Sequence, residues 1–317
     1  MKKTILVLFE VNEQHKKLLE SRAPGADFIY AGFKTVKKEQ IQKAQIILGN
    51  PPAPLLQDAP NLEWLQLRSA GVGAYAEEHI LSPKVILTNM SGAYGLAISE
   101  YMLGVLLEMY NNLHFYRDQQ AQSKWSYLGN VRSVHGSVAL VLGVGDIGGQ
   151  FAEKLKCLGA YTIGVRRKDA DKPAYLDELH FMEQLEDLLP RADIVSLSLP
   201  ETKLTQRIIN RETLALMKKD AVLINIGRGS AVDTEALCDA LEAGQLLGAA
   251  LDVIDPEPLP EEHRLWKIKN AVITPHASGR LGAQITHDNT VNLCVQNLEA
   301  YINGLPLINV VDRTAGY

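Results

Sequence analysis

Three short motifs in the second half of the chain carry side chains that could do chemistry together. They are NIGRG (225–229), LDVIDPEPL (251–259) and TPHASG (274–279). An arginine fork can bind a carboxylate through two hydrogen bonds, and a histidine can give or take a proton near neutral pH. A carboxylate beside such a histidine favours its protonated form. Arg228, Glu257 and His276 in one site would therefore bind an anionic substrate and move a proton.

A glycine-rich turn upstream of these motifs is suited to a dinucleotide. The apolar run VALVL is followed by GVGDIG at 143–148 and then by an amphipathic segment. This is the strand, G-x-G-x-x-G turn and helix start of a dinucleotide-binding unit. Gly143 would make the tight turn, Gly145 would let a pyrophosphate approach, and Gly148 would let the helix pack on the strand. The helix N-terminus would bind the phosphates; the alternative is a plain tight turn.

The turn after the next strand predicts which nicotinamide cofactor is bound. An NAD site of this kind usually has an Asp or Glu about 20 residues past the glycine turn. Here the strand at 161–165 ends in Arg166-Arg167-Lys168, and the nearest acid is Asp169. Arginine accommodates the 2′-phosphate that a carboxylate would repel. We predict that NADP(H) is preferred and that NAD(H) is possible; the alternative is a solvated basic turn that tolerates either cofactor.

The elements that must position these residues alternate between short apolar runs and helical segments, which predicts parallel sheets with helices on both faces. In the first third we expect strands at 5–9, 28–30, 44–48, 62–67 and 85–87, with helices at 13–21 and 37–43. In the second set we expect six strands, at 138–142, 161–165, 194–199, 221–226, 249–253 and 271–273. Ligands bind beyond the carboxyl ends of the strands in such a sheet, so the chemical motifs and the glycine turn should converge.

Two long helices link the two sets of strands. One helix is expected at 99–122, and another, at 285–303, follows the last strand and should return to the first set. We therefore predict an α/β protein with one domain made of 1–98 and 285–317 and a nucleotide-binding domain of 99–284 inserted in it. Hinges are expected near 92–99 and 279–284. Trp125 and Trp266 are interpreted as packing anchors.

The composition is that of an ordinary globular protein, with 317 residues, 46% hydrophobic residues and a formal net charge of −5. This length predicts about two domains. The mild acidity and the lack of a long basic run argue against nucleic acid as a partner. The short apolar run near the N-terminus is better interpreted as a strand than as a signal peptide, and no apolar run is long enough for a membrane helix. Cys157, Cys238 and Cys294 are interpreted as buried thiols without metal-ligand spacing, so we expect a cytoplasmic protein with no metal site.

The order of the motifs resembles the family of D-isomer-specific 2-hydroxyacid dehydrogenases, in its glyoxylate/hydroxypyruvate reductase-like branch. SAGVG (69–73) comes first, and GVGDIG, NIGRG, LDV-x-DPEPLP and TPHASG follow. The resemblance spans essentially the whole chain, and the motifs are highly specific in combination. It implies a flavodoxin-like substrate domain formed by both termini, an inserted Rossmann dinucleotide-binding domain, and a homodimer.

The resemblance also implies roles for individual residues. Arg228 would bind the substrate carboxylate and polarise the 2-oxo group, His276 would be the general acid in reduction, and Glu257 would orient His276 and hold it protonated. The backbone of Ser69, Ala70 and Gly71 would bind the substrate carboxylate. The implied cofactor contacts, together with the basic turn, are Gly143, Gly145, Asp146, Ile147, Gly148, Arg166, Arg167, Leu199, Pro200, Ile226, Asp252 and Ser278. Each member of the catalytic trio could instead be structural or solvated, and Asp252 could cap or bridge instead of contacting the nicotinamide.

Two positions depart from the family pattern. Gly73 stands where the family often has Asp, and Ser198 stands where it often has His before a Leu-Pro pair. These departures put the substrate shape and the cofactor fit in doubt but leave the catalytic trio intact.

The predicted function is NADPH-preferring reduction of a small 2-oxoacid, such as glyoxylate, hydroxypyruvate or a bulkier one, to the D-2-hydroxy acid. One alternative is a phosphoglycerate dehydrogenase-like NAD enzyme, which would want more basic residues and often a C-terminal regulatory domain; the sequence ends at Tyr317. The other is a nucleotide-sensing binding protein, a class that carries extended tails for its partners. Retained NADP(H) binding without any 2-oxoacid reduction would favour that class.

Overall fold

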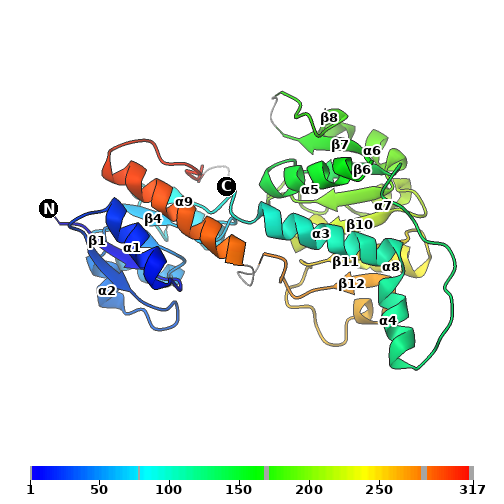
Figure 1. Ribbon diagram of the computed structural model, residues 1–317, viewed down its shortest axis with the longest axis horizontal. Coiled ribbons are helices and arrows are strands. Elements are labelled where there is room, and N and C mark those ends of the chain that lie inside the picture. The colour runs from blue at the N-terminus through cyan, green and yellow to red at the C-terminus, as the bar shows by residue number, and fades with distance from the viewer. Residues whose placement is uncertain (1, 78, 168–170, 280–283, 314–317) are drawn as a thin grey trace. The chain divides into compact units, whose positions relative to one another are not determined.

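The computed structural model describes residues 2–77, 79–167, 171–279 and 284–313. The chain forms two compact units, one of Met1–Tyr94 and Leu281–Tyr317 and the other of Gly95–Arg280 (Figure 1). The sequence placed these boundaries at 98 and 284, and its second expected hinge falls partly outside the described residues. Among the described helices, none has the length and apolar character needed to cross a membrane.

The first unit is built on a five-stranded sheet with the order β2-β1-β3-β4-β5. Its strands are β1 (Thr4–Val7), β2 (Asp27–Tyr30), β3 (Ile46–Leu48), β4 (Trp64–Gln66) and β5 (Ile86–Thr88). All pair in parallel, and the order is that of the flavodoxin-like fold. The five expected strands are confirmed. Most of their residues are buried because helices cover both faces of a parallel sheet.

The helices of the first unit come from both ends of the chain. They are α1 (Glu13–Arg22), α2 (Lys38–Lys43) and α9 (Gln284–Ile302), with the short 3₁₀ helices η1 (Ala53–Asp58) and η2 (Gly73–Ala76). The α9 helix packs against α1. Its buried Asn297 donates to Gln66 Oε1 (2.8 Å) and to Ile308 O (3.0 Å). The expected return of the chain to the first set of strands is therefore confirmed.

The second unit contains a seven-stranded parallel sheet with the order β12-β11-β10-β9-β6-β7-β8. Its strands are β6 (Val138–Leu142), β7 (Tyr161–Arg166), β8 (Glu178–Phe181), β9 (Ile194–Leu197), β10 (Val222–Asn225), β11 (Gly248–Leu251) and β12 (Ala271–Ile273). The chain runs outward from β6 to β8 and then returns to β9, which is the Rossmann arrangement. The six expected strands are confirmed. The sheet has a seventh, β8, whose sequence ELHF is short and half polar because it lies at the edge.

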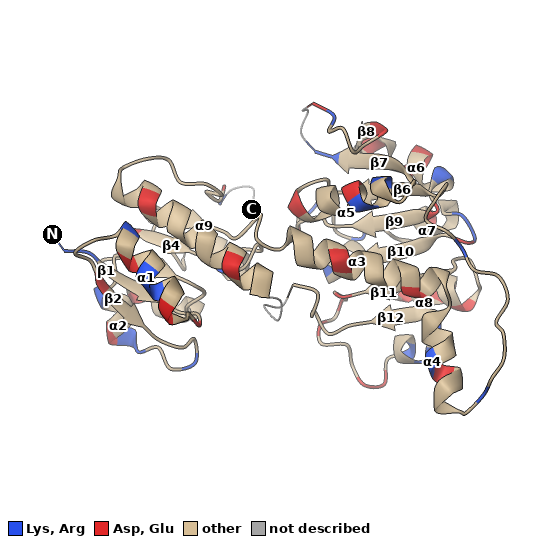
Figure 2. Ribbon diagram, viewed as in Figure 1, with Lys and Arg blue, Asp and Glu red and all other residues tan. Residues whose placement is uncertain are grey.

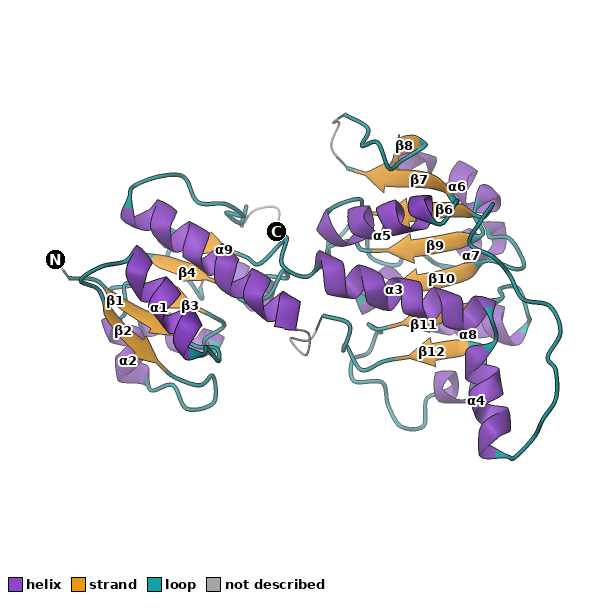
Figure 3. Cartoon of the chain, in the orientation of Figure 1, coloured by secondary structure: helices purple, strands orange, loops and turns teal. Residues whose placement is uncertain are grey.

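Helices cover both faces of this second sheet (Figure 3). They are α3 (Gly95–Tyr110), α4 (Leu113–Ala121), α5 (Asp146–Cys157), α6 (Leu185–Leu188), α7 (Arg211–Leu216) and α8 (Thr234–Glu242), with the 3₁₀ helices η3 (Met182–Gln184), η4 (Leu189–Arg191), η5 (Gly229–Ala231) and η6 (Arg264–Lys267). The α3 and α5 helices pack together and against the strands. Side chains of α6 and α8 form a core with inward residues of β6, β9 and β10.

The single helix expected at 99–122 is wrong in its extent. The structure has two helices, and they are separated at Asn112, whose φ is 57°. Asparagine tolerates this left-handed conformation better than most residues, so it can end one helix and start the next. The first of the two also starts earlier, at Gly95, because Asp146 Oδ2 accepts a hydrogen bond from its N–H group (2.8 Å).

Two other expectations about packing are corrected by the exposure of the side chains. Trp125 is fully exposed and Trp266 is about half exposed, so neither is a packing anchor. Cys238 and Cys294 are buried as expected, but Cys157 is exposed because it lies at the end of α5. Acidic and basic residues are interspersed over the ribbons of both units (Figure 2).

Candidate functional site

The three chemical motifs lie together at one edge of the second sheet. Arg228 follows β10, Asp252 follows β11 and His276 follows β12, and these strands are neighbours. All run in parallel, so their carboxyl ends share one edge. The loops also touch: a Cβ on Gly229 would lie 2.0 Å from Ile254 O. The sequence predicts this convergence, and within the second unit the structure confirms it.

His276 and Glu257 form a hydrogen-bonded pair. The Nδ1 atom of His276 lies 2.8 Å from Glu257 Oε1, and both side chains are about half exposed. An ionised carboxylate only accepts hydrogen bonds, so Nδ1 carries the hydrogen and donates it. The other ring nitrogen, Nε2, has no hydrogen-bond partner among the described residues. The pair therefore fixes the ring and leaves Nε2 available for proton transfer.

The backbone of His276 is held in an uncommon conformation. Its φ is 49°, in the left-handed region that residues other than glycine rarely adopt. Its N–H donates to Asp252 O at 2.9 Å. Such a conformation persists where its surroundings hold it, and it is frequent at functional sites.

Asp252 supplies those surroundings. Its buried carboxylate accepts hydrogen bonds from Ala277 N (2.7 Å), from Ser278 N (3.0 Å) and from the hydroxyls of Thr274 and Ser278. The structure thus shows Asp252 bridging the His276 loop, the alternative that the sequence left open. Tyr101 on α3 joins this network through Thr274 Oγ1 (2.7 Å). This role could not be predicted from the sequence, because Tyr101 is part of an apolar helical pattern.

Hydrogen bonds hold the backbone of Arg228, and the positive charge of its guanidinium is not paired with a described acidic residue. Its carbonyl oxygen accepts from Asn225 Nδ2 (2.9 Å), and Asn225 Oδ1 accepts from Gly227 N (3.1 Å). The guanidinium donates through Nη1 to Gly227 O (2.6 Å). It forms no ion pair with a described residue. Its charge can therefore bind an anion that enters from solvent.

The glycine turn has the geometry of a phosphate-binding loop. Gly143 has φ of +90°, and a Cβ on Gly148 would lie 2.0 Å from Gly143 O. Only glycine therefore lets α5 approach β6 this closely. The N–H groups of 144–147 donate to no described residue, and the N-cap Gly145 supplies no capping side chain. Free N–H groups at the start of a helix can bind phosphate oxygens.

The carboxylate of Asp146, at the start of α5, accepts hydrogen bonds from other groups of the protein. The carboxylate accepts from Gly95 N (2.8 Å) and from Gln150 Nε2 (2.8 Å). Its expected contact with a cofactor would therefore be made by its backbone N–H group.

The loop after β9 packs against the glycine turn. Ser198 Oγ donates to Gly143 O at 2.6 Å and so stabilises the turn. This is what the serine does where the family often has histidine. Of the neighbouring residues expected at the cofactor, Leu199 and Ile226 are buried and Pro200 is exposed.

The basic turn after β7 carries two arginines in its described part. Arg166 is half-buried and Arg167 is exposed, while Lys168 and Asp169 lie outside the described residues. Burial raises the pKa of the nearby Tyr175, Glu153 raises it further, and Arg166 opposes both. No described acidic residue forms an ion pair with Arg166. Arg166 therefore presents a positive charge at the end of β7.

In the expected substrate loop of the first unit, the carbonyl oxygens accept hydrogen bonds from other groups of the same unit. Ser69 O accepts from Met90 N (3.0 Å), Ala70 O accepts from Asn89 Nδ2 (2.9 Å), and Gly71 O accepts from Ser69 Oγ (2.6 Å). The N–H groups of Ser69, Ala70 and Gly71 donate to no described residue. Consecutive free N–H groups of this kind can bind an anion.

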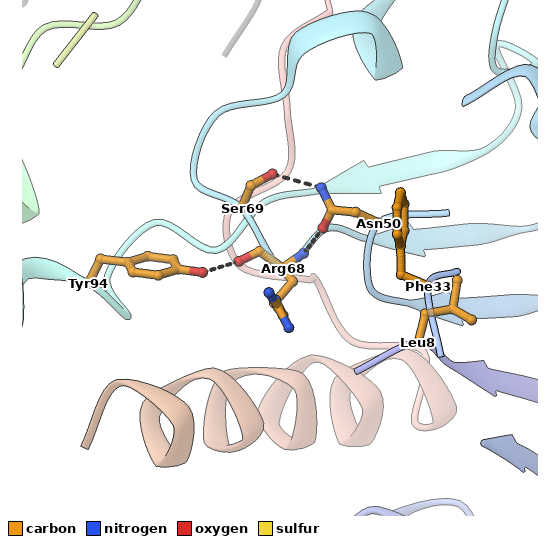
Figure 4. A pocket seen from close by; sticks show the side chains of 6 residues that line it. All are labelled: Leu8, Phe33, Asn50, Arg68, Ser69 and Tyr94. Atoms are coloured by element: carbon orange, nitrogen blue, oxygen red, sulfur yellow. Dashed lines mark hydrogen bonds between the residues drawn. The ribbon is translucent and has the colours of Figure 1, made fainter. Parts of the chain in front are cut away.

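A cavity of about 300 Å³ adjoins this loop (Figure 4). It is lined by Leu8, Phe33, Asn50, Arg68, Ser69 and Tyr94. Sequence reasoning missed Arg68 and Asn50. The position of Arg68, a cation directly before the SAGVG motif, was the signal that could have identified it.

Comparisons with known proteins agree with this architecture. Residues 103–278 match the family model described as the NAD binding domain of D-isomer specific 2-hydroxyacid dehydrogenases. A glyoxylate reductase from Thermofilum pendens is 34% identical over 80% of this chain and 75% of its own length.

Two solved structures are also similar over nearly the full chain. A D-isomer specific 2-hydroxyacid dehydrogenase family protein from Aeromonas salmonicida is 32% identical, with a TM-score of 0.87 over 99% of this chain and 100% of that chain. A D-isomer specific 2-hydroxyacid dehydrogenase from Xanthobacter autotrophicus, solved with NADPH and MES, is 26% identical, with a TM-score of 0.83 over 100% of both chains.

Proposed function

Because the chain belongs to the D-isomer specific 2-hydroxyacid dehydrogenase family, and so to the NAD(P)-dependent oxidoreductases, we propose that it reduces a small 2-oxoacid to the D-2-hydroxy acid, with NADPH preferred. The observation that carries this proposal is the His276–Glu257 hydrogen bond of 2.8 Å. It provides an oriented acid in the loop cluster that also holds Arg228. Glyoxylate and hydroxypyruvate are the first candidate substrates, and the Thermofilum relative is named a glyoxylate reductase.

The glycine turn fits the phosphates of a dinucleotide. The free N–H groups of 144–147 and the close packing at Gly148 leave room and donors for a pyrophosphate. The bound cofactor would supply a hydride, and the protein would supply orientation and electrostatics. The proposed contacts are Gly143, Gly145, Asp146, Ile147, Gly148, Leu199, Pro200, Ile226, Asp252 and Ser278. Asp252 already accepts four hydrogen bonds, so its carboxylate would at most share one with the nicotinamide amide.

Arg228, His276 and Glu257 have separate proposed tasks. The Arg228 guanidinium binds the substrate carboxylate and polarises the 2-oxo group. In reduction His276 Nε2 gives its proton to the oxygen of the 2-oxo group, and in oxidation the neutral ring takes that proton back. Glu257 accepts the Nδ1 hydrogen throughout, which stabilises the protonated ring before the transfer. The N–H groups of Ser69, Ala70 and Gly71 also bind the substrate carboxylate.

The preference for NADPH rests on Arg166 and Arg167. An arginine at the end of the second Rossmann strand can bind a 2′-phosphate through two hydrogen bonds. The similar protein from Xanthobacter autotrophicus was solved with NADPH. NADH remains a permitted cofactor because the described turn contains no group that would repel it.

We further propose a cytoplasmic homodimer. The described cysteines are all free thiols, which suits a reducing compartment. The segment after α3 exposes large apolar side chains that a second copy could bury: Leu113, Trp125, Tyr127 and Val131. Aromatic side chains are enriched at protein interfaces.

A panel of 2-oxoacids, each with NADPH and with NADH, tests the function through the loss of reduced-cofactor absorbance. We expect glyoxylate or hydroxypyruvate to be reduced, with a chiral product assay giving the D-isomer for substrates that form a stereocentre. Cofactor binding without reduction of any 2-oxoacid would contradict the proposal and favour the nucleotide-sensing alternative.

A further inference from the structure

The cavity of the first unit combines an apolar wall with one cation. Leu8 and Phe33 lie on one side, and Arg68 and Tyr94 lie on the other (Figure 4). The volume of about 300 Å³ exceeds what a substrate as small as glyoxylate would fill. The cavity can therefore take a side chain attached to the carbon next to the 2-oxo group.

The backbone of Arg68 is fixed by two side chains. Its N–H donates to Asn50 Oδ1 (2.7 Å), and its carbonyl oxygen accepts from the hydroxyl of Tyr94. Asn50 Nδ2 in turn donates to Ser69 Oγ (3.0 Å). These bonds place the start of the Arg68 side chain at the cavity wall, next to the SAGVG loop.

The guanidinium itself has no partner within the described chain. In Figure 4 the hydrogen bonds of Arg68 come from its backbone, and none reaches the guanidinium. No described residue forms an ion pair with it, although it is only partly exposed. A partly buried arginine of this kind is stabilised when an anion with two oxygens binds its fork.

The charged residues near Arg68 do not neutralise its guanidinium. Burial lowers the pKa of His287, and His15 and Arg68 lower it further, while Asp288 and Glu10 raise it. Asp288 is committed to His15 Nε2 (3.2 Å) and Gln284 Nε2 (2.8 Å). The lowered pKa favours the neutral ring of His287, and neither acid forms an ion pair with Arg68.

Resting on the proposed function, we infer that this cavity selects 2-oxoacids with a second anionic group, a carboxylate or a phosphate, at the end of the side chain. Arg68 binds that second group. Ser69 belongs both to the cavity wall and to the loop proposed to bind the first carboxylate, so a substrate held by that loop has its side chain within reach of Arg68. The arginine is thus a specificity-determining residue that acts only on substrates with a distal charge.

The test compares pairs of substrates that differ in the distal group alone. 2-Oxoglutarate is paired with 2-oxopentanoate, which has a methyl group in place of the distal carboxylate, 3-phosphohydroxypyruvate is paired with hydroxypyruvate, and glyoxylate has no side chain. We expect kcat/KM with NADPH to be about 10- to 100-fold higher for at least one dianionic substrate than for its partner. The two pairs distinguish a carboxylate from a phosphate.

Variants test whether the side chain of Arg68 causes the preference for a distal anionic group. Arg68→Met should remove the preference and leave glyoxylate turnover within about twofold, whereas Arg68→Lys should keep part of the preference. Arg22→Met removes the same charge from α1, outside the cavity, and should change neither. Circular dichroism of each variant checks that it is folded.

The outcomes separate the two proposals. Glyoxylate turnover without a dianion preference, or an equal loss on all substrates in Arg68→Met, overturns this inference and leaves the proposed function intact. If no 2-oxoacid is reduced, the proposed function fails, and calorimetric titration with 2-oxoglutarate and with 3-phosphohydroxypyruvate decides the inference. Weaker binding of either by Arg68→Met supports it, and equal binding of both overturns it.

Discussion

The chemistry available to His276 depends on which of its two ring nitrogens forms the hydrogen bond to Glu257. A histidine whose Nδ1 donates to a carboxylate keeps its second nitrogen available for proton transfer. The sequence predicted both residues from their motifs. Which nitrogen faces Glu257 follows only from the folded loop, because residues 257 and 276 come from different strand ends.

The first prediction concerns this acid. His276→Ala should lower kcat for 2-oxoacid reduction by roughly 100- to 10,000-fold, the usual contribution of a general acid. The Kd for NADPH, measured by fluorescence titration, should stay nearly unchanged because the glycine turn is untouched. His79→Ala is the matched control, since His79 also lies beside an exposed glutamate, at 3.4 Å, but in the other unit. An active His276→Ala variant would show that another group gives the proton.

The second prediction concerns the basic turn. Replacement of both Arg166 and Arg167 by Ala should reduce kcat/KM for NADPH by roughly 10- to 100-fold, since charge-assisted hydrogen bonds to the 2′-phosphate are lost. The value for NADH should change little and serves as the internal control. Steady-state kinetics with both cofactors measure the effect. A wild-type enzyme that clearly prefers NADH would refute the assignment.

At the level of secondary structure, the loop after β12 is held in place by the side chain of Asp252, which follows β11. Asp252 accepts two N–H groups and two hydroxyls of that loop, and its backbone oxygen holds His276. The family resemblance suggested a cofactor contact for this carboxylate. The structure shows that it holds the loop that carries His276.

The third prediction tests that role. Asp252→Asn keeps one accepting oxygen and places an NH₂ group against one of the two N–H donors, so the loop should lose the N–H hydrogen bond to the replaced oxygen. We expect a loss of roughly 2–3 kcal/mol in the free energy of unfolding, together with a lower kcat, measured by urea denaturation and by the reductase assay. Asp58→Asn, at an exposed carboxylate of the first unit, is the control. A variant with full stability and full kcat would show that Asp252 does not hold the loop.

The edge strand β8, which the sequence analysis missed, carries its own ion-pair cluster. Glu178 accepts from Arg191 Nη1 (3.0 Å) and lies 2.7 Å from His180 Nε2. The hydrogen bonds from Arg191 lower the pKa of Glu178 from 4.5 to about 2, with further help from His180 and Tyr161. These interactions stabilise β8, which pairs with another strand on one side only.

The fourth prediction follows from the sign of that shift. A carboxylate whose pKa is lower in the folded state stabilises the fold above its unfolded value and loses that effect as the pH falls. The contribution of Glu178 should therefore be full above pH 4.5 and should disappear as the pH falls to about 2. In urea unfolding across this range, Glu178→Gln should show a shallower loss of stability than the wild type. Glu186→Gln on α6 should follow the wild-type curve, and an identical curve for Glu178→Gln would refute the prediction.

At the scale of the whole molecule, the segment after α4 has side chains that the single chain does not bury. Trp125 is fully exposed, and Tyr127 and Val131 are exposed beside it. From the sequence, Trp125 was expected to be a packing anchor within the chain. Because Trp125 is exposed, a second copy of the chain could bury its side chain instead.

The fifth prediction is a homodimer that depends on this segment. Light scattering after gel filtration should give twice the chain mass of 34.9 kDa. The double variant Trp125→Ser and Tyr127→Ser should raise the dimer Kd more than roughly tenfold, because aromatic anchors dominate many interfaces. Trp266→Ser, at a half-exposed tryptophan outside this segment, is the control. A wild-type chain that stays monomeric at all concentrations would rule out the dimer.

The sequence alone determined the strands, the glycine turn and the order of the chemical motifs. These features are local: a buried parallel strand needs an apolar run, and a close approach such as that at Gly148 needs glycine. The edge strand β8 and the break at Asn112 were missed because neither has a strong local pattern. An edge strand is half polar, and a helix can end at one residue in a left-handed conformation.

Tertiary structure decided the partners of the polar groups. The Asp252 network depends on residues that are distant in sequence and meet only in the fold. The same is true of Nε2 of His276 and the guanidinium of Arg68, which have no partner among the described residues. A hydrogen bond has a strict distance and angle, so whether a polar side chain is satisfied or free cannot be read from its neighbours along the chain. The reaction class therefore follows from local motifs, whereas the preference for a dianionic substrate is proposed from a cavity that only the folded chain forms.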